Sequence, residues 1–493
     1  MSEVVTNPIN EREERLKKLA LIKALPLDPY PATGRRDLSL GEVLSNFDKY
    51  LASGEELYLA GRLRVIRSHG NLTFAHLQDG KDLMQIALSK KDIGDDLYKR
   101  FIKLVDTGDF LAIKAKCFNT HKGEPSLMVS DWQLITKTLR PLPEKWHGLT
   151  DDEERLRKRY LDIMFNAEVY EMIEKRSRFW NAVRSFLLNR GFLEVETPVL
   201  ETTTGGADAK PFVTYHNALD MGVYLRISMG ELWQKKLMVA GFPKTFEIGR
   251  QFRNEGMDAE HLQDYTQMEF YLAYANYEVG MKLVEEMYKY VAQETFGTLQ
   301  FKIKDFDINL DQPWERYDYR ETVLKYTKVD ILKADEKEIR QKLDELGVKY
   351  DEKGFNITRA IDNLWKYCRK QIAGPGFLVG VPVTISPLAK RDTTNPDLAQ
   401  RFQPIIAGSE LGNGYSELND PLDQEQRFLS QQKLREDGDE EAQMHDHDFV
   451  EALEYGMPPT CGFGMSERVF SFLMNKSARE CQIFPLLKPK NEK

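Results

Sequence analysis

Two arginines lie where the sequence could bind a phosphate. Arg253, in FEIGRQFRNEG, stands between two stretches with strand-like alternation and is followed by a polar loop. A guanidinium on such a rigid support can bind a phosphate through two parallel N–H bonds. Arg468 follows the closely spaced glycines of GFGMSERVF and precedes an apolar helix, as expected where backbone and guanidinium approach a nucleotide. Taken alone, the first segment is better explained as a hairpin with a surface salt bridge, and a glycine-rich turn is weak evidence.

Carboxylates gather in two other segments. In DYTQMEFYL, strand alternation puts Gln267, Glu269 and Tyr271 on one face, while Met268 and Phe270 point to the other. The segment GSELGNGYSELN has similar spacing, so we expect one strand face to carry Glu410, Asn413, Tyr415 and Glu417. Acidic groups on two neighbouring strands favour a cationic ligand, because a buried carboxylate needs a compensating ammonium. The alternative is a solvated acidic sheet edge.

The sequence around these segments divides into two regions with different patterns, and the first of them is the N-terminal region. Residues 10–24 have the spacing of a short helix. From about residue 55 to 140, short alternating runs such as LTFAHLQDG are broken by Gly, Asn and Asp, and KKDIGDDLYKRFIKLV has helical spacing. This predicts a five-stranded barrel with one helix between strands, as in oligonucleotide-binding (OB) folds. Two prolines followed by a charged helix suggest a linker near residues 140–150.

The remainder is expected to be a larger domain in which helical stretches precede strands, so the predicted fold class is α+β. We expect an N-terminal five-stranded OB-fold β-barrel followed by a domain built on an antiparallel β-sheet flanked by helices. The charged helical pattern of residues 330–372 predicts a helical insertion within that domain.

Composition narrows the class of protein. The chain has 493 residues and a net charge of −9, so a nucleic-acid partner must bind through local basic patches. No run of about 18 apolar residues occurs, and the first residues are polar, which predicts neither a membrane span nor a secretory signal and favours a cytoplasmic protein. Four cysteines are too far apart for a disulfide framework or a structural zinc site, namely Cys117, Cys368, Cys461 and Cys481.

The segment HDHDF at residues 445–449 is a further candidate, since its two histidines could hold a metal ion. We favour a structural interpretation, because they lie in an acidic loop before a helix and Asp448 can cap that helix.

Taken in order, these segments resemble the three signature motifs of class II aminoacyl-tRNA synthetases, and most closely the class II lysyl-tRNA synthetases. The resemblance covers nearly the whole chain and includes RPLPEKWHGLTDDEERLRKRYLDI, GGADAKPFVTYHNALD, FRNEG, SPLAKR, ELGNGYSELNDPLDQEQRF and EALEYGMPP. It implies ATP-dependent activation of L-lysine to lysyl-adenylate and transfer to tRNA(Lys) for protein synthesis. It also implies a homodimer, and an organisation into a helical extension (1–50), an anticodon-binding OB domain (51–142) and a catalytic domain (143–493).

The resemblance assigns nucleotide-binding roles. Arg253 would hold the α-phosphate and the lysine carboxylate, and Tyr265 would stack on adenine. Glu255, His261 and Arg468 would complete the ATP site. Arg253, Arg468 and Glu269 would be the catalytic residues. Glu410 would coordinate Mg²⁺, a hard cation that bridges phosphate oxygens.

The resemblance also assigns the lysine and anticodon sites. Glu417 and Tyr271 would bind the ε-ammonium of lysine. The residues near its α-amine would be Gly206, Glu231 and Glu269, and the side-chain slot would be lined by Asn413 and Tyr415. In the barrel, the central anticodon base would meet Phe74, Gln85 and Glu124, since single-stranded RNA is read by stacking and hydrogen bonds. The alternative for Phe74 is a core aromatic.

Several positions depart from the family. Glu260 stands where an arginine is usual and would repel phosphate, and Gln403 replaces a metal-binding acid. Met229-Gly230 replaces a single proline, and the third motif is one residue shorter before Arg468. We nevertheless predict activity. The alternatives are a paralogue that passes lysine to another acceptor, a non-catalytic RNA-binding protein, and an aspartate or asparagine ligase. Against the last, Glu269 and Glu417 would repel an acidic side chain.

Overall fold

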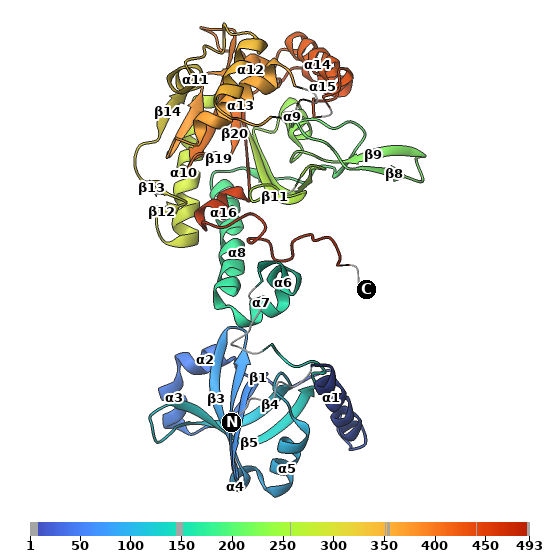
Figure 1. The fold of residues 1–493 in the computed structure, drawn as a ribbon, viewed down its shortest axis with the longest axis vertical. Helices are drawn as coiled ribbons and strands as arrows, with labels where there is room; N and C mark the ends of the chain where they lie inside the picture. The colour runs from blue at the N-terminus through green and yellow to red at the C-terminus, as the bar shows by residue number, and fades with distance from the viewer. Residues whose placement is uncertain are drawn as a thin grey trace. The chain divides into compact units, whose positions relative to one another are not determined.

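The computed structural model describes residues 8–490 except 144–150, Met257, Asp351, 353–354 and Glu440. The chain divides into two compact units, Met1–Tyr170 and Glu171–Lys493, and Figure 1 shows the elements of each. The predicted linker near 140–150 falls mostly on residues 144–150, outside the described residues.

The first unit contains a closed five-stranded barrel in the order β1-β2-β3-β5-β4 (Figure 1). Its strands are β1 (Leu57–His69), β2 (Leu72–Asp79), β3 (Asp82–Ser89), β4 (Phe110–Asn119) and β5 (Pro125–Thr136). Its helices are α1 (Pro8–Lys23), α2 (Leu40–Ser45), α3 (Phe47–Ser53), α4 (Lys90–Ile93), α5 (Asp95–Leu104), α6 (Asp152–Arg157) and α7 (Arg159–Phe165). Because α4 and α5 come between β3 and β4, the predicted OB fold is confirmed.

The alternation of apolar residues explains the barrel. Leu57, Leu59 and Leu63 of β1 are buried in a single core, and side chains at alternating positions of a strand point to the same face. The pairing of β1 with β2 shifts register between Leu63 and Ile66. Such a bulge bends a strand, which lets β1 pair with β2 along one part and with β4 along another.

A nine-stranded sheet forms the second unit, in the order β14-β15-β18-β20-β21-β11-β10-β6, with β19 paired to β18 (Figure 1). The centre is antiparallel, and the two end pairs, β10 with β6 and β14 with β15, are parallel. The strands are β6 (Leu193–Glu194), β10 (Lys244–Phe252), β11 (Asp264–Ala273), β14 (Glu315–Asp318), β15 (Gly376–Val379), β18 (Arg401–Ile406), β19 (Ser409–Glu410), β20 (Asn413–Ser416) and β21 (Thr460–Ser466).

Smaller sheets and helices complete the fold. The small sheets are β7 (Leu200–Glu201), β8 (Val213–His216) and β9 (Met221–Leu225); β12 (Gln300–Ile303) and β13 (Phe306–Asn309); and β16 (Val381–Pro382) and β17 (Leu398–Ala399). The helices are α8 (Ala167–Leu188), α9 (Glu231–Val239), α10 (Tyr277–Phe296), α11 (Tyr319–Thr327), α12 (Glu336–Glu345), α13 (Ile357–Arg369), α14 (Pro421–Glu436), α15 (His447–Glu454) and α16 (Arg468–Leu473). Two of them, α12 and α13, occupy the segment predicted to be a helical insertion.

Helix α10 packs closely against one face of the large sheet. A Cβ on Gly280 of α10 would lie 3.0 Å from the ring of Phe402 and would also strike the Cys461 sulfur. Phe402 stacks on Phe463 with ring centroids 5.7 Å apart, and Phe270 packs against the same ring. These aromatic side chains fill one face of the sheet, so polar side chains from the same strands emerge on the other. No helix among the described residues combines the length and the apolar character that crossing a bilayer requires.

Candidate active site

One pocket gathers every residue predicted in the second unit for nucleotide, lysine or metal binding. Its lining includes Gly206, Glu231, Arg253, Glu255, His261, Tyr265, Glu269, Tyr271, Glu410, Asn413, Tyr415, Glu417 and Arg468. The alternation predicted for β11 explains part of this arrangement: Gln267, Glu269 and Tyr271 line the pocket, while Met268 and Phe270 are fully buried.

Strand β21 lies between the two acidic segments. It pairs Gly464 with Glu269 on one side and with Asn413 on the other, and it pairs Gly462 with both Tyr271 and Tyr415. The prediction that the acidic segments lie on neighbouring strands was therefore wrong. The prediction that Glu410 shares a strand with Asn413 and Tyr415 was also wrong, since Glu410 lies on β19 and the other two lie on β20.

The glycines of β21 make room for the acidic side chains. A Cβ on Gly462 would strike Oε1 of Glu417 and lie 2.6 Å from the ring of Tyr271. A Cβ on Gly464 would lie 3.0 Å from Cγ of Glu269. The spacing of these two glycines had suggested an approach to the nucleotide, but their position shows that they let side chains from both flanking strands extend across β21.

Three carboxylates are buried together in this part of the pocket. Glu231, Glu269 and Glu417 have exposed fractions of 5%, 5% and 2%. Glu269 accepts hydrogen bonds from the backbone N–H of Met229 (3.0 Å), from Nε2 of Gln267 (2.6 Å) and from the Tyr271 hydroxyl (3.0 Å). The Tyr415 hydroxyl donates to Glu231. Such partners offset part of the cost of burying the charges.

Lys235 supplies a buried ammonium that we did not predict. Its Nζ lies 2.8 Å from Oε1 of Glu231 and 2.6 Å from Oε2 of Glu417. Burial lowers the pKa of Lys235, but the two carboxylates raise it above its ordinary value overall, so the ammonium stays charged. The only sequence signal was its position one helical turn after Glu231.

Two of these carboxyl groups, those of Glu269 and Glu417, have pKa values well above their usual range. Burial raises the pKa of Glu417 to about 8, against the opposing effect of Lys235, and Glu231 raises it further. Burial and the neighbouring Glu231 raise the pKa of Glu269 to about 7. Among the described residues, Lys235 is the one cation that forms ion pairs with these three carboxylates, so they would gain from a ligand that brings further ammonium groups.

Two backbone features support Glu231 and Glu269. Gly206 has φ +86°, and a Cβ there would lie 2.7 Å from Cβ of Glu231. Gly230, with φ +64°, precedes α9, where a side chain would strike Thr197. The Met229-Gly230 pair leaves Met229 with the N–H that Glu269 uses, a donor that proline would lack.

Arg253 begins the loop after β10 with part of its guanidinium unpaired. Its backbone N–H donates to the carbonyl of Gln263 (2.8 Å), which holds the residue against the start of the return strand. The guanidinium carbon lies 5.8 Å from the ring centroid of Tyr265. Among the described residues, its buried Nε has no hydrogen-bond partner, so it remains available for an anion.

The carboxylate of Glu260 binds the guanidinium of Arg468, the second arginine predicted to bind the nucleotide. Nη2 of Arg468 donates to Oε2 of Glu260 (2.8 Å) and to Oγ of Ser409 (2.7 Å), while Nζ of Lys304 lies 3.1 Å from Oε1 of Glu260. Burial raises the pKa of Glu260, but Arg468 and Lys304 lower it overall, so it is ionised at neutral pH. The carboxylate expected to repel phosphate is thus compensated by two cations.

The remaining predicted ligands also line the pocket. His261 contacts both carboxylate oxygens of Asp258, at 2.9 and 2.8 Å. Glu410 accepts a hydrogen bond from the indole of Trp365. Gln403 also lines the pocket, with its side chain buried.

The predicted anticodon residues lie on the barrel. Phe74 is half-buried and is not part of the barrel core, unlike its neighbour Ala75, so the interpretation as a core aromatic is not supported. Nε2 of Gln85 donates to Oγ of Ser126 (2.9 Å). Glu124 is exposed in the turn between β4 and β5, and OB folds use such turns to bind oligonucleotides.

Comparison with protein families agrees with this fold and pocket. A family described as "tRNA synthetases class II (D, K and N)" matches residues 151–488, and one described as "OB-fold nucleic acid binding domain" matches residues 57–135. The first match covers most of the chain, which is therefore a class II tRNA synthetase.

Full-length relatives narrow the class. The chain is 42% identical over 489 residues to the lysine–tRNA ligase of Thermotoga maritima, covering 97% of this chain and 96% of the relative. Identity to the lysine–tRNA ligase of Roseiflexus sp. is 42% over 489 residues (98% and 100%), and to that of Moorella thermoacetica 44% over 482 residues (97% and 98%). Within its class, the chain belongs to the lysine–tRNA ligase family.

Proposed function

We propose that this protein activates L-lysine with ATP to form lysyl-adenylate and then transfers the lysyl group to tRNA(Lys). The observation that carries the proposal is the charge of the part of the pocket that holds the buried carboxylates. Three buried carboxylates, Glu231, Glu269 and Glu417, surround one ammonium, that of Lys235. When all are ionised, two negative charges remain without a cation. Lysine carries two ammonium groups, whereas aspartate would add a carboxylate to an acidic pocket.

The two ends of lysine would meet different groups. Oε1 of Glu417 lies beside Gly462 on the pocket side, while Oε2 is held by Lys235, so we assign Oε1 to the ε-ammonium. The Tyr271 hydroxyl donates its proton to Glu269 and keeps its lone pairs for the same ammonium. Glu231 and Glu269, with the space above Gly206, receive the α-ammonium. Asn413 and Tyr415 line the slot between the two ends.

The reaction requires no protein nucleophile. A lysine carboxylate oxygen attacks the α-phosphorus of ATP, and pyrophosphate leaves with the electron pair of the broken P–O bond. A terminal hydroxyl of tRNA then attacks the lysyl carbonyl, and AMP leaves. Arg253 aligns the carboxylate with the α-phosphate, and both it and Arg468 offset developing negative charge. Tyr265 provides a surface for the adenine, and Glu255 and His261 border the phosphate end.

Magnesium fits the donor set at the phosphate end. Glu410 offers a carboxylate oxygen and Gln403 an amide oxygen, both in the pocket lining. Mg²⁺ is commonly bound by one or two carboxylates together with substrate phosphates. We assign Glu410 as its main protein ligand, where the ion would neutralise phosphate charge.

The barrel is assigned to the anticodon. Phe74 would stack on a base, and Gln85 and Glu124 would form hydrogen bonds to it. We assign residues 1–50 to a helical extension, 51–142 to the anticodon-binding domain and 143–493 to the catalytic domain. Since translation takes place in the cytoplasm, that is the proposed location.

A homodimer would cover exposed apolar side chains between the end of α8 and β7. The large apolar side chains there are exposed by 41 to 48%, and they are Leu188, Leu193, Val199 and Leu200. Several large apolar side chains left exposed within one stretch of chain are typical of protein interfaces. Light scattering should give twice the chain mass, and Leu193→Glu with Leu200→Glu should give the monomer.

Amino-acid-dependent exchange of pyrophosphate into ATP tests the activation step. Lysine should support exchange, whereas ornithine, arginine, aspartate and asparagine should support far less. Glu417→Gln and Arg253→Ala should each lose most of the activity while remaining folded by circular dichroism. No exchange with any amino acid, in the presence of Mg²⁺, would reject the proposal in favour of a non-catalytic RNA-binding protein. Exchange without charging of tRNA(Lys) would point instead to another lysine acceptor.

A further inference from the structure

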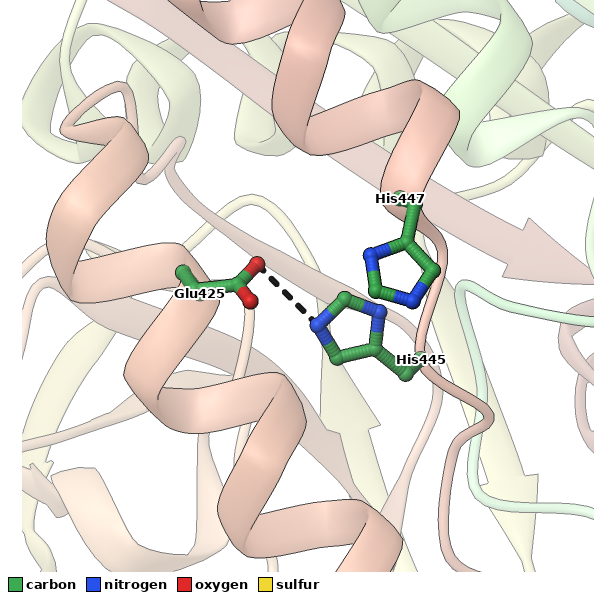
Figure 2. Close-up of side chains that lie close together, drawn as sticks. All are labelled: Glu425, His445 and His447. Carbon is green, nitrogen blue, oxygen red and sulfur yellow. Dashed lines mark ion pairs between the residues drawn. The ribbon is translucent and has the colours of Figure 1, made fainter.

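Two histidines and a glutamate converge away from the lysine pocket. Figure 2 shows Glu425 of α14 facing His445, which lies just before α15, with His447 beside it at the start of that helix. One potential ligand atom from each of the three residues lies within 4.8 Å of the other two. Two separate parts of the chain, α14 and the segment that begins α15, therefore bring nitrogen and oxygen ligands to one place.

His445 is buried without satisfied ring nitrogens. Its side chain is 8% exposed, and among the described residues neither ring nitrogen forms a hydrogen bond. Nε2 lies 3.0 Å from Oε2 of Glu425 without the alignment of a hydrogen bond. The rings of His445 and His447 are 3.8 Å apart between centroids. Because unsatisfied buried polar atoms are costly, this arrangement points to a further partner.

We propose that Glu425, His445 and His447 bind a transition-metal cation of the zinc class. Two imidazoles and one carboxylate, with water as the fourth ligand, form a well-known tetrahedral zinc set. Bond lengths of about 2.0–2.2 Å put neighbouring ligand atoms roughly 3.3 Å apart, so small side-chain movements suffice here. Imidazole ligands favour zinc, cobalt or nickel over Mg²⁺, which prefers oxygen and serves the phosphate end of the other pocket.

The surroundings leave the three ligands available and reachable. Asp446 accepts from the backbone N–H of Phe449 (2.9 Å) and caps α15, while Asp448 pairs with Lys236. The prediction that Asp448 is the cap was therefore wrong, and neither aspartate competes for the histidines. A surface pocket is lined by Glu425 and His447 together with the acidic residues Glu451 and Glu454. It gives a cation a route from solvent and a negative field that attracts it.

A bound metal would hold α14 to α15 next to the lysine pocket. Two residues before His445, Gln443 lines that pocket, with its Nε2 3.5 Å from Asp208. The metal would thus fix the segment that carries Gln443. Stabilisation by metal, rather than a new reaction, is the expected consequence.

Titration with Co²⁺ tests the site, because tetrahedral Co²⁺ absorbs visible light strongly and does so without ATP or lysine. Untagged, chelator-treated protein should bind one equivalent, which Zn²⁺ displaces, and Zn²⁺ should raise the Tm. His445→Ala and Glu425→Gln should each weaken Co²⁺ binding at least about tenfold and lose the Zn²⁺-dependent rise in Tm. His121→Ala, which removes an exposed barrel histidine, is the control and should behave as the parent.

The variants separate loss of the site from loss of folding. Both should retain lysine-dependent pyrophosphate exchange in Mg²⁺, which shows that the catalytic domain is folded. The proposal is overturned if the parent shows no tetrahedral spectrum, or if Glu425→Gln binds Co²⁺ as tightly as the control. Failure of pyrophosphate exchange in the parent itself would reject the proposed function and leave the cobalt result intact.

Discussion

Nζ of Lys235 lies 2.6 Å from Oε2 of Glu417, so the protein's own ammonium holds one oxygen of the carboxylate that we assign to the substrate's ammonium. The other oxygen, Oε1, lies beside Gly462 on the pocket side. Glu417 would therefore bridge two ammonium groups, one internal and one from the ligand. The internal pair fixes the carboxylate before lysine arrives, so binding loses little side-chain entropy.

Replacing Lys235 should destabilise the protein strongly. Lys235→Met keeps a side chain of similar length but leaves Glu231 and Glu417 without their cation. We expect this to lower the free energy of unfolding by about 3–5 kcal/mol. Urea denaturation measures this change. The matched control is Lys236→Met, whose partner Asp448 is 79% exposed; it should change stability by less than about 1 kcal/mol. If the two substitutions changed the free energy of unfolding equally, the buried ion pairs of Lys235 would not contribute to stability.

Lysine binding should release protons. Burial raises the pKa of Glu417 to about 8 and that of Glu269 to about 7, so both are protonated in the free pocket at lower pH. Ammonium groups bind the ionised forms, and lysine affinity should rise with pH from about 5 to 8. Calorimetry near pH 6.5, in buffers of different ionisation enthalpy, should detect the release, and Glu417→Gln should reduce it. Affinity independent of pH would contradict the assignment.

The same shifts affect stability in the absence of lysine. A carboxyl group whose pKa is raised by folding stabilises the folded state below its ordinary pKa. This contribution is lost as the pH rises through the raised value, here about 7 for Glu269 and about 8 for Glu417. Saturating lysine should therefore raise the Tm more at pH 8 than at pH 6. An increase of equal size at both pH values would argue against buried, protonated carboxyl groups.

Removing the charge of Glu260 should improve ATP binding. Glu260→Gln frees Nη2 of Arg468 for phosphate, so the KM for ATP should fall about fivefold, corresponding to roughly 1 kcal/mol. Lys304→Met is the converse variant, because it leaves Glu260 bound more strongly to Arg468 and should raise this KM. The KM for lysine should not change in either variant. A higher KM for ATP in Glu260→Gln would mean that the carboxylate has a positive role in binding ATP.

A methyl group on Gly462 should damage the lysine pocket specifically. In Gly462→Ala, the added Cβ strikes Glu417 and lies 2.6 Å from the ring of Tyr271, so we expect the KM for lysine to rise more than about tenfold. The KM for ATP should change little. Gly222→Ala is the matched control, since no atom lies within 4 Å of its added Cβ. Equal lysine kinetics in the two variants would refute the proposed role of Gly462.

Local patterns in the sequence predicted the faces of strands but not their order. The alternation around Glu269 was enough to place Gln267 and Tyr271 beside it, and the barrel followed from short alternating runs. The position of β21 between β11 and β20 could not be predicted from the sequence of either strand. Pairing between strands that are distant in sequence depends on the whole sheet. The assignment of Glu410 failed for a related reason: two residues separate β19 from β20 and end the alternation.

Contacts between side chains that are far apart in sequence could not be predicted either. Glu260 and Arg468 are far apart in sequence, so nothing local indicated that one would neutralise the other. The same holds for Lys235 and Glu417. The error at the start of α15 was local: Asp446 and Asp448 are both acceptable caps, and only the backbone position of Phe449 decides between them.

Because side chains of the flanking strands lie directly over the glycines of β21, the proposed lysine slot can change in only one direction at these positions. Any single substitution at Gly462 or Gly464 adds atoms that meet Glu417, Tyr271 or Glu269, so it can only push these side chains into the space proposed for lysine. Admitting an amino acid longer than lysine cannot be achieved at these positions and would require a change in the flanking strands. Specificity against larger amino acids is in this sense built into the backbone, whereas discrimination against smaller ones depends on side chains that can mutate.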